Sequence, residues 1–207
     1  MTICPMELQL DRDVMIEQPP LSARLAVKAL GECALRTAAL LVRRRLHQPD
    51  EHVGRSCSFA DGTTALVYRE TVVDHPPMQS PAVLVVGFRL RWVRSPWAHA
   101  LFRLESVLNT LLFAGFPGFV SKLWLAHDEH RVYRGLYEWD DPVLAEDYVR
   151  ALWWVLALVS VPSSIHYAVL PGMRRDDLLR DPHVADATVV DETLGWWQLN
   201  AMEASAR

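Results

Sequence analysis

The sequence has few of the residues that characterise several large classes of protein. Its 207 residues include 9 glycines, 13 prolines and 3 cysteines, too few for a collagen-like, low-complexity or disulfide-stabilised chain. Cys4, Cys33 and Cys57 are odd in number and show neither C-x-x-C nor Cys/His ligand spacing. This pattern predicts neither zinc nor attached haem. It is typical of a reducing compartment, so we expect a cytoplasmic protein.

Positive charge and long apolar runs are also scarce. The formal net charge is −4, which argues against a nucleic-acid partner, because a phosphate backbone requires a basic surface. Asp11, Asp13 and Glu17 come early, so we do not expect a secretory signal. The longest apolar run, residues 151–161, is about half the length of a membrane span. We therefore expect no stable membrane insertion.

The motifs of common cofactor and nucleophile sites are missing. We find no Gly-rich phosphate loop, G-x-S-x-G elbow or kinase signature, so we expect no nucleotide, flavin or other cofactor. The segment His127-Asp128-Glu129-His130 has metal-binding residue types. It falls in a predicted turn, however, and lacks the helical H-E-x-x-H spacing. We therefore expect no metal site there.

Hydrophobic residues make up 51% of the chain and charged residues 22%, as in a soluble globular domain. We divide the chain into an N-terminal arm (1–20), a helix and hairpin extension (21–80), a core (81–172) and a C-terminal arm (173–207). These boundaries follow changes in hydrophobic periodicity and the proline-rich connectors between segments.

The extension combines a helix with a β-hairpin. Apolar residues recur at helical spacing over residues 21–46, with Ser22 as a candidate N-cap. The basic end of this helix leaves open a role at a membrane surface. Residues 56–60 and 63–73 flank Asp61-Gly62, a pair that favours a type I′ turn.

The core shows the element order β-α-β-β-α-β. We predict its elements at residues 82–93, 95–114, 119–126, 131–139, 140–160 and 165–170. Asp140 or Asp141 is the candidate cap of the second helix, with Pro142 in its first turn. This order predicts an α+β fold with a ferredoxin-like core, in which a four-stranded antiparallel sheet carries both helices on one face. The other face would then be uncovered, although it carries Trp and Tyr. A second copy would bury it most simply, so we expect a homodimer.

Three segments carry a resemblance to a known superfamily: GFPGFVSKLW at residues 115–124, YRGLYEW at 133–139 and AEDY at 145–148. They resemble the dimeric α+β barrel superfamily, and within it the YdhR-type monooxygenases, which are related to the antibiotic-biosynthesis monooxygenases. The resemblance covers residues 83–172, under half of the chain. The added N-terminal helix, hairpin and C-terminal arm depart from the minimal domain of that superfamily.

The resemblance implies a small-molecule enzyme. Some members oxidise aromatic, polyketide-like substrates with O₂ and without a metal or flavin, whereas others isomerise, degrade haem or bind ligands. We therefore expect a cofactor-independent monooxygenase that acts on a hydrophobic aromatic or polyketide-like substrate. Two alternatives stay open: a cyclase or isomerase that uses no O₂, and a non-catalytic homodimer that binds a hydrophobic small molecule.

Oxygenation without a cofactor requires that an acidic enol or phenol is ionised in a dry pocket. Histidine is the side chain best suited to act as a base at physiological pH, which makes His166 a candidate. An amide in an apolar stretch, such as Asn109, needs a partner. The candidate catalytic residues are His166, Tyr137 and Asn109, and the candidate substrate-binding residues are Trp124, Tyr133, Arg134, Trp139, Phe88 and Arg103.

Each candidate also has a purely structural interpretation. The aromatic side chains are typical of a packed interface, and His166 is compatible with a hydrogen-bonded core histidine. Arg134 and Glu138 are spaced to pair with charges on neighbouring strands. Arg103 belongs to a polar stripe with the spacing of a solvated helix face.

Overall fold

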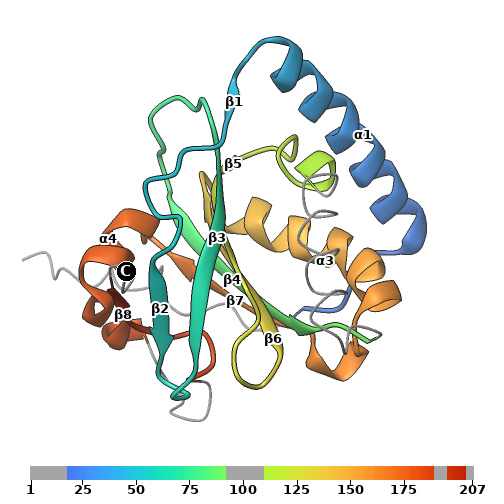
Figure 1. Cartoon of the computed structure of the whole chain (residues 1–207). Helices are drawn as coiled ribbons and strands as arrows, with labels where there is room; N and C mark the ends of the chain where they lie inside the picture. Colours follow the sequence, from blue (N-terminus) through green and yellow to red (C-terminus); the bar gives the residue numbers. More distant parts are fainter. Residues whose placement is uncertain (1–17, 92–109, 189–194, 204–207) are drawn as a thin grey trace, which may run out of the picture.

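A single antiparallel sheet organises the molecule (Figure 1). The computed structural model describes residues 18–91, 110–188 and 195–203 of the chain. The sheet has eight strands in the order β7-β4-β6-β5-β3-β2-β8, and β1 pairs with β3. The strands are β1 Leu46–His47, β2 Ser56–Phe59, β3 Thr64–Val73, β4 Ala82–Arg89, β5 Phe119–Leu125, β6 Val132–Trp139, β7 His166–Pro171 and β8 Leu199–Glu203.

Three α-helices accompany the sheet in the described residues: α1 (Ala23–Val42), α3 (Pro142–Val159) and the short α4 (Arg175–Arg180). Short 3₁₀ turns occupy Thr110–Leu112, Pro162–Ser164 and Pro182–Thr188. None of the helices in this part of the chain is both long enough and apolar enough to cross a membrane.

The local signals of the sequence explain where several elements begin. Asp141 caps α3 as predicted, and its Oδ1 accepts hydrogen bonds from the amides of Val143 (2.7 Å) and Leu144 (3.3 Å). The predicted hairpin between β2 and β3 is confirmed, but its turn is not of type I′, because Gly62 has a positive φ and Asp61 does not. Gly62 has a φ of 80°, and Asp61 Oδ1 accepts the amide of Thr63 at 3.0 Å. A side chain at position 62 would be strained, which is why glycine suits this turn.

The chain itself covers both faces of the sheet (Figure 1). Helices α1 and α3 cover one face, here called the α1/α3 face, where Leu84, Trp124 and Tyr148 belong to one buried cluster. The other face, here called the α4 face, is covered by α4, the 182–188 turn and β8. Leu136 and Trp197 belong to the buried cluster on that side.

The expectation of a ferredoxin-like β-α-β-β-α-β core is therefore wrong. The hairpin and the C-terminal arm are not additions to a four-stranded sheet, because β3 pairs with β5 and β8 pairs with β2 in one curled, barrel-like sheet. The expected helix 95–114 lies outside the described residues except for its last turn. The molecule is α+β, and its described strands form one long antiparallel sheet.

The α4 face also differs from the expectation of an uncovered surface. Trp197 is 3% exposed there and Leu178 of α4 is 1% exposed, so the C-terminal residues supply the apolar cover that a second copy was expected to supply. The physical argument for a dimer through this face does not hold. Burial of an apolar sheet face needs a partner layer, and the chain provides that layer itself.

Candidate functional site

A buried lysine surrounded by aromatic rings is the most unusual feature of the α1/α3 face. Lys122 of β5 is 6% exposed. Its Nζ lies 3.2 Å from the ring centroid of Trp124, 4.5 Å from that of Tyr137 and 4.8 Å from that of Phe113. These ring faces attract a cation electrostatically. Lysine is among the residues least often buried without a charged partner, so its position requires an explanation.

Strand alternation brings these groups together. Lys122 and Trp124 are two residues apart on β5, so they share the α1/α3 face. Across the ladder, Lys122 is the partner of Tyr137 on β6 and of Thr71 on β3. Phe113 comes from the turn before β5 and closes the cluster from the helix side. We call Lys122, Trp124, Tyr137 and Phe113 the lysine cluster.

The surroundings of Lys122 favour its neutral form. Among the described residues, no ion pair or hydrogen bond holds Nζ. Burial removes the hydration of the ammonium, and the positive charge of Arg69 opposes a second cation, so the pKa of Lys122 lies well below its ordinary value. An amine that loses its proton more readily is available as a base or a nucleophile.

Arg69 and two threonines fix the indole beside the lysine. The guanidinium of Arg69 lies 5.1 Å from the Trp124 ring, and its Nη2 donates to Thr110 Oγ1 at 2.5 Å. Trp124 Nε1 donates to Thr71 Oγ1 at 3.2 Å. Burial lowers the pKa of Arg69, but a guanidinium remains charged in proteins. Two cationic side chains thus lie close to one indole ring.

Two tyrosine hydroxyls meet next to the cluster. The hydroxyl of Tyr148 on α3 donates to that of Tyr137 at 3.3 Å, and both residues are buried. Burial raises the pKa of both phenols, so both stay protonated over the physiological range. Because Tyr137 accepts this bond, its own hydrogen remains to be donated to another oxygen.

The structure places five of the candidate residues on the α1/α3 face. Trp124 and Tyr137 belong to the lysine cluster. Trp139 is fully buried, with its ring 5.0 Å from that of Tyr148. Phe88 and Tyr133 stack on each other at 6.0 Å, farther along β4 and β6. These last three fit their structural interpretation as packing residues.

Arg134 and His166 lie on the opposite face. Arg134 forms ion pairs with Asp61 (2.7 Å) and Asp128 (2.5 Å), which fixes the hairpin turn onto β6. His166 is exposed, and its ring lies 6.0 Å from that of Trp196. Strand alternation puts these side chains across the sheet from Tyr137, so the structure does not bring them to the lysine cluster. Asn109 and Arg103 lie outside the described residues.

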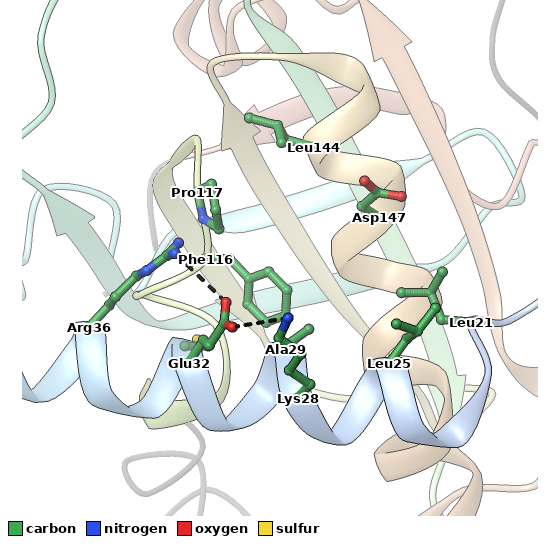
Figure 2. Close-up of a pocket in the computed structure, with 11 residues that line it drawn as sticks. Leu21, Leu25, Lys28, Ala29, Glu32, Arg36, Phe116, Pro117, Leu144 and Asp147 are labelled. Carbon is green, nitrogen blue, oxygen red and sulfur yellow. Dashed lines mark ion pairs between the residues drawn. The ribbon is translucent and has the colours of Figure 1, made fainter.

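A groove opens to solvent on the far side of the Phe113 turn, between α1 and α3 (Figure 2). Its volume is about 340 Å³. The floor is apolar and the rim is charged. The lining residues are Leu21, Leu25, Lys28, Ala29, Glu32, Cys33, Arg36, Phe116, Pro117, Leu144 and Asp147. Figure 2 shows the Phe116 ring between the two helices.

Sequence reasoning missed Lys122 and Arg69 as site residues. One signal was available for Lys122, because it is one of only two lysines in the chain and lies between apolar residues in a predicted strand. Arg69 could not be placed by alternation. A bulge shifts the β3–β5 register between Val67 and Arg69, so Arg69 reaches the α1/α3 face while Val67 packs on the α4 face.

Within the described ranges, no group of three or more His, Cys, Asp or Glu side chains is placed to hold a metal ion. No family model matches the chain, and no curated protein matches it significantly. A solved structure described as "Structure of a major regulator of staphylococcal pathogenesis" aligns with a TM-score of 0.35 and 14% identity, covering 66% of this chain and 91% of that chain. The family resemblance stays a prediction.

Proposed function

We propose that this protein is a small-molecule enzyme that removes a proton from an apolar phenol or enolisable ketone, with Lys122 as the base. The observation that supports the proposal is an amine buried among the rings of Trp124, Tyr137 and Phe113. A base must have a free lone pair at the working pH, and the desolvated Lys122 has one at a lower pH than a lysine in water.

The surroundings of Lys122 also suit the products of proton transfer. When Nζ takes the proton, an ammonium forms next to the enolate or phenolate. The two opposite charges attract strongly where water is excluded. The ring faces of the lysine cluster stabilise the cation, and Tyr137 donates its remaining hydrogen to the substrate oxygen that gains negative charge.

In the oxygenation that we propose, the substrate anion supplies the electrons. It passes one electron to O₂, and the two radicals combine at carbon. Loss of water then converts the methylene group into a carbonyl, so that CH₂ and O₂ become C=O and H₂O. The substrate is oxidised, one oxygen atom enters the product and the other leaves as water. This sequence uses no cofactor.

Anthrone is a suitable probe, because it is apolar and its ring methylene is acidic. We expect O₂ uptake and formation of anthraquinone with the wild-type protein. Lys122→Met removes the base and should lower the rate by about 10²–10⁴, the usual contribution of a positioned base. Arg24→Met is the control, since Arg24 is an exposed cation on α1 that does not line the groove between α1 and α3.

Anaerobic exchange in D₂O separates the alternatives. Exchange of the anthrone methylene that depends on Lys122, without aerobic O₂ uptake, would indicate a cyclase or isomerase that uses the same base. If Lys122→Met changes neither exchange nor O₂ uptake for anthrone and related phenols, Lys122 is not a base and the proposal fails. A non-catalytic protein that binds an apolar ligand would then be the better description.

The proposal also includes a cellular compartment and an oligomeric state. Cys33 and Cys57 form no disulfide with each other, which suits a reducing, cytoplasmic compartment. A homodimer is part of the proposal only as an expectation from the family resemblance. Sedimentation of the purified chain at several concentrations tests it, and a monomer at all concentrations would remove the dimer from the proposal without affecting Lys122.

A further inference from the structure

The groove between α1 and α3 has the properties of a binding site for a neutral, apolar molecule. Its volume of about 340 Å³ lies within the range of small-molecule pockets. Leu25, Ala29 and Leu144 contribute to the apolar surface. The charged rim is balanced, with two cations and two carboxylates: Lys28, Arg36, Glu32 and Asp147.

The rim charges are also paired. Glu32 Oε1 lies 3.9 Å from Lys28 Nζ, and Glu32 Oε2 lies 3.8 Å from an Arg36 guanidinium nitrogen (Figure 2). Asp147 pairs with Arg150 at 3.8 Å. With Arg150 included, these pairs join three cations to two carboxylates, so the rim has an excess of one positive charge, spread over solvent-accessible side chains. Such charges attract a ligand only weakly in water, so the apolar floor decides what binds, and the groove favours an uncharged compound.

A single turn separates this groove from the lysine cluster. The amide of Phe116 donates to the carbonyl of Phe113 at 3.0 Å, which closes the turn. Phe113 lies on the inner side, with its ring 4.8 Å from Lys122 Nζ. Phe116 lies on the outer side, where it lines the groove and its ring is 5.1 Å from that of Tyr148.

The aromatic contacts continue from the groove to the amine. The ring of Tyr148 lies 5.5 Å from that of Tyr137, and the Tyr137 ring lies 4.5 Å from Lys122 Nζ. Phe116 is half-buried, whereas the rings behind it are buried. The Phe116 side chain is thus the outermost ring of a series that ends at the proposed base.

The backbone of this turn cannot move towards α1. A Cβ added at Gly115 would lie 2.1 Å from the Cys33 carbonyl oxygen and 2.6 Å from the Thr37 amide nitrogen, which shows how closely the turn packs on the helix. Rotation of a side chain opens the turn without breaking this packing. Phe116, which borders open space in the groove, is the ring with room to rotate.

We propose that the groove between α1 and α3 binds the apolar body of the substrate, and that Phe116 is the gate through which its reactive carbon reaches Lys122. This inference rests on the proposed function, because it takes Lys122 as the group to be reached. It specifies the substrate as an uncharged aromatic carbonyl compound or phenol with an apolar body.

The chain contains only two lysines, which allows a direct test of access. Benzaldehyde with cyanoborohydride serves as an apolar probe. The amine and the aldehyde form an imine with loss of water, and hydride from the reagent reduces C=N to a stable benzylamine. Peptide mass spectrometry then gives the ratio of benzylated to unmodified Lys122 after a fixed reaction time.

Two groups of variants should shift this ratio in opposite directions. Phe116→Ala opens the gate and should raise the ratio by about tenfold, since labelling of a buried group follows the population of the open state. Phe116→Leu, a milder change, should give a smaller increase if the alanine variant does not fold. Ala29→Trp fills the groove and should lower the ratio. Val27→Trp is the matched control on α1, because Val27 is 70% exposed and does not line the groove.

Formaldehyde distinguishes failure of the gate from failure of the base. If formaldehyde methylates Lys122 but none of the Phe116 and Ala29 variants changes the benzylation ratio, the groove is not the route, although the proposed function stands. If Lys122 resists formaldehyde in every folded variant, the amine is unreactive, and both proposals are overturned. A shifted ratio in Val27→Trp as large as that in Ala29→Trp would also contradict a specific role for the groove.

Discussion

Arg175 of α4 and Glu70 of β3 form a buried ion pair, in which Arg175 Nη1 lies 2.8 Å from Glu70 Oε1. The second carboxylate oxygen of Glu70 contacts His52 Nδ1, also at 2.8 Å. Residues that are far apart in the sequence are thus tied to one carboxylate under the α4 face. Since a buried charge is costly without a partner, this contact fixes α4 to the sheet.

The first prediction concerns this ion pair. Arg175→Leu leaves the Glu70 charge buried with only His52 beside it, so the free energy of unfolding should fall by about 3–5 kcal/mol. Equilibrium urea denaturation measures the change. Arg180→Leu is the control, because Arg180 forms an exposed pair with Asp177 on the same helix and should cost less than about 1 kcal/mol. Equal losses in the two variants would contradict the role given to Glu70.

The second prediction compares Gly115, which packs tightly against α1, with Gly31, which faces open space on α1. Gly115→Ala forces a methyl group against the carbonyl of Cys33, and overpacking of this kind should cost about 1–3 kcal/mol or more. Gly31→Ala on α1 meets no atom within 4 Å, so it should instead stabilise the helix by about 0.5–1 kcal/mol. Thermal unfolding should therefore shift in opposite directions, and a shared direction would show that the turn is not packed as described.

The third prediction follows from the lowered pKa of Lys122. The unfolded chain binds this proton up to the ordinary value of 10.5, whereas the folded chain releases it earlier. The unfolded state thus holds more protons in between, so the contribution of Lys122 to stability rises with pH through this window. Denaturation of the wild type and of Lys122→Met between neutral pH and about pH 9 should show a steeper rise for the wild type. Parallel curves would mean that Lys122 has an ordinary pKa.

The fourth prediction concerns the two described thiols. Burial raises the pKa of Cys33 and raises that of Cys57 to about 12, so neither forms a thiolate readily at neutral pH. Cys33 lines the groove, whereas Cys57 lies in the cluster of the α4 face. Bromobimane labelling followed by peptide mapping should therefore modify Cys33 before Cys57 and both only slowly. Faster labelling of Cys57 would contradict this arrangement of the two faces.

Local signals predicted the elements well. Asp141 before Pro142 marked the start of α3, and Asp61-Gly62 marked the hairpin, because capping and turn chemistry depend on neighbouring residues. Which strands pair with one another was harder to predict from the sequence. The ladder between β3 and β5 and the cover that Trp197 provides are contacts between distant segments, which periodicity does not report.

The candidate site was predicted in part. Trp124 and Tyr137 were chosen as side chains able to polarise a substrate, and both contact Lys122. His166 was chosen because histidine commonly acts as a base, but residue type does not show whether a side chain is buried, and the structure leaves His166 exposed on the α4 face. Lys122 was overlooked because lysine usually belongs to the surface, and only the assembled sheet shows what surrounds it.

The pairing of β2 with β8 has a consequence for how the chain reaches its folded state. Ser56 is the partner of Glu203, so this ladder joins segments from the two ends of the described fold. During synthesis, β2 can pair with β3 on one side, while its other side keeps free backbone donors and acceptors until residues 199–203 emerge from the ribosome. Contacts between such distant segments form slowly, and an unpaired strand edge is a site of aggregation. Until β8 has been made, this edge of β2 is open to pairing with other chains, and its pairing with β8 removes that risk.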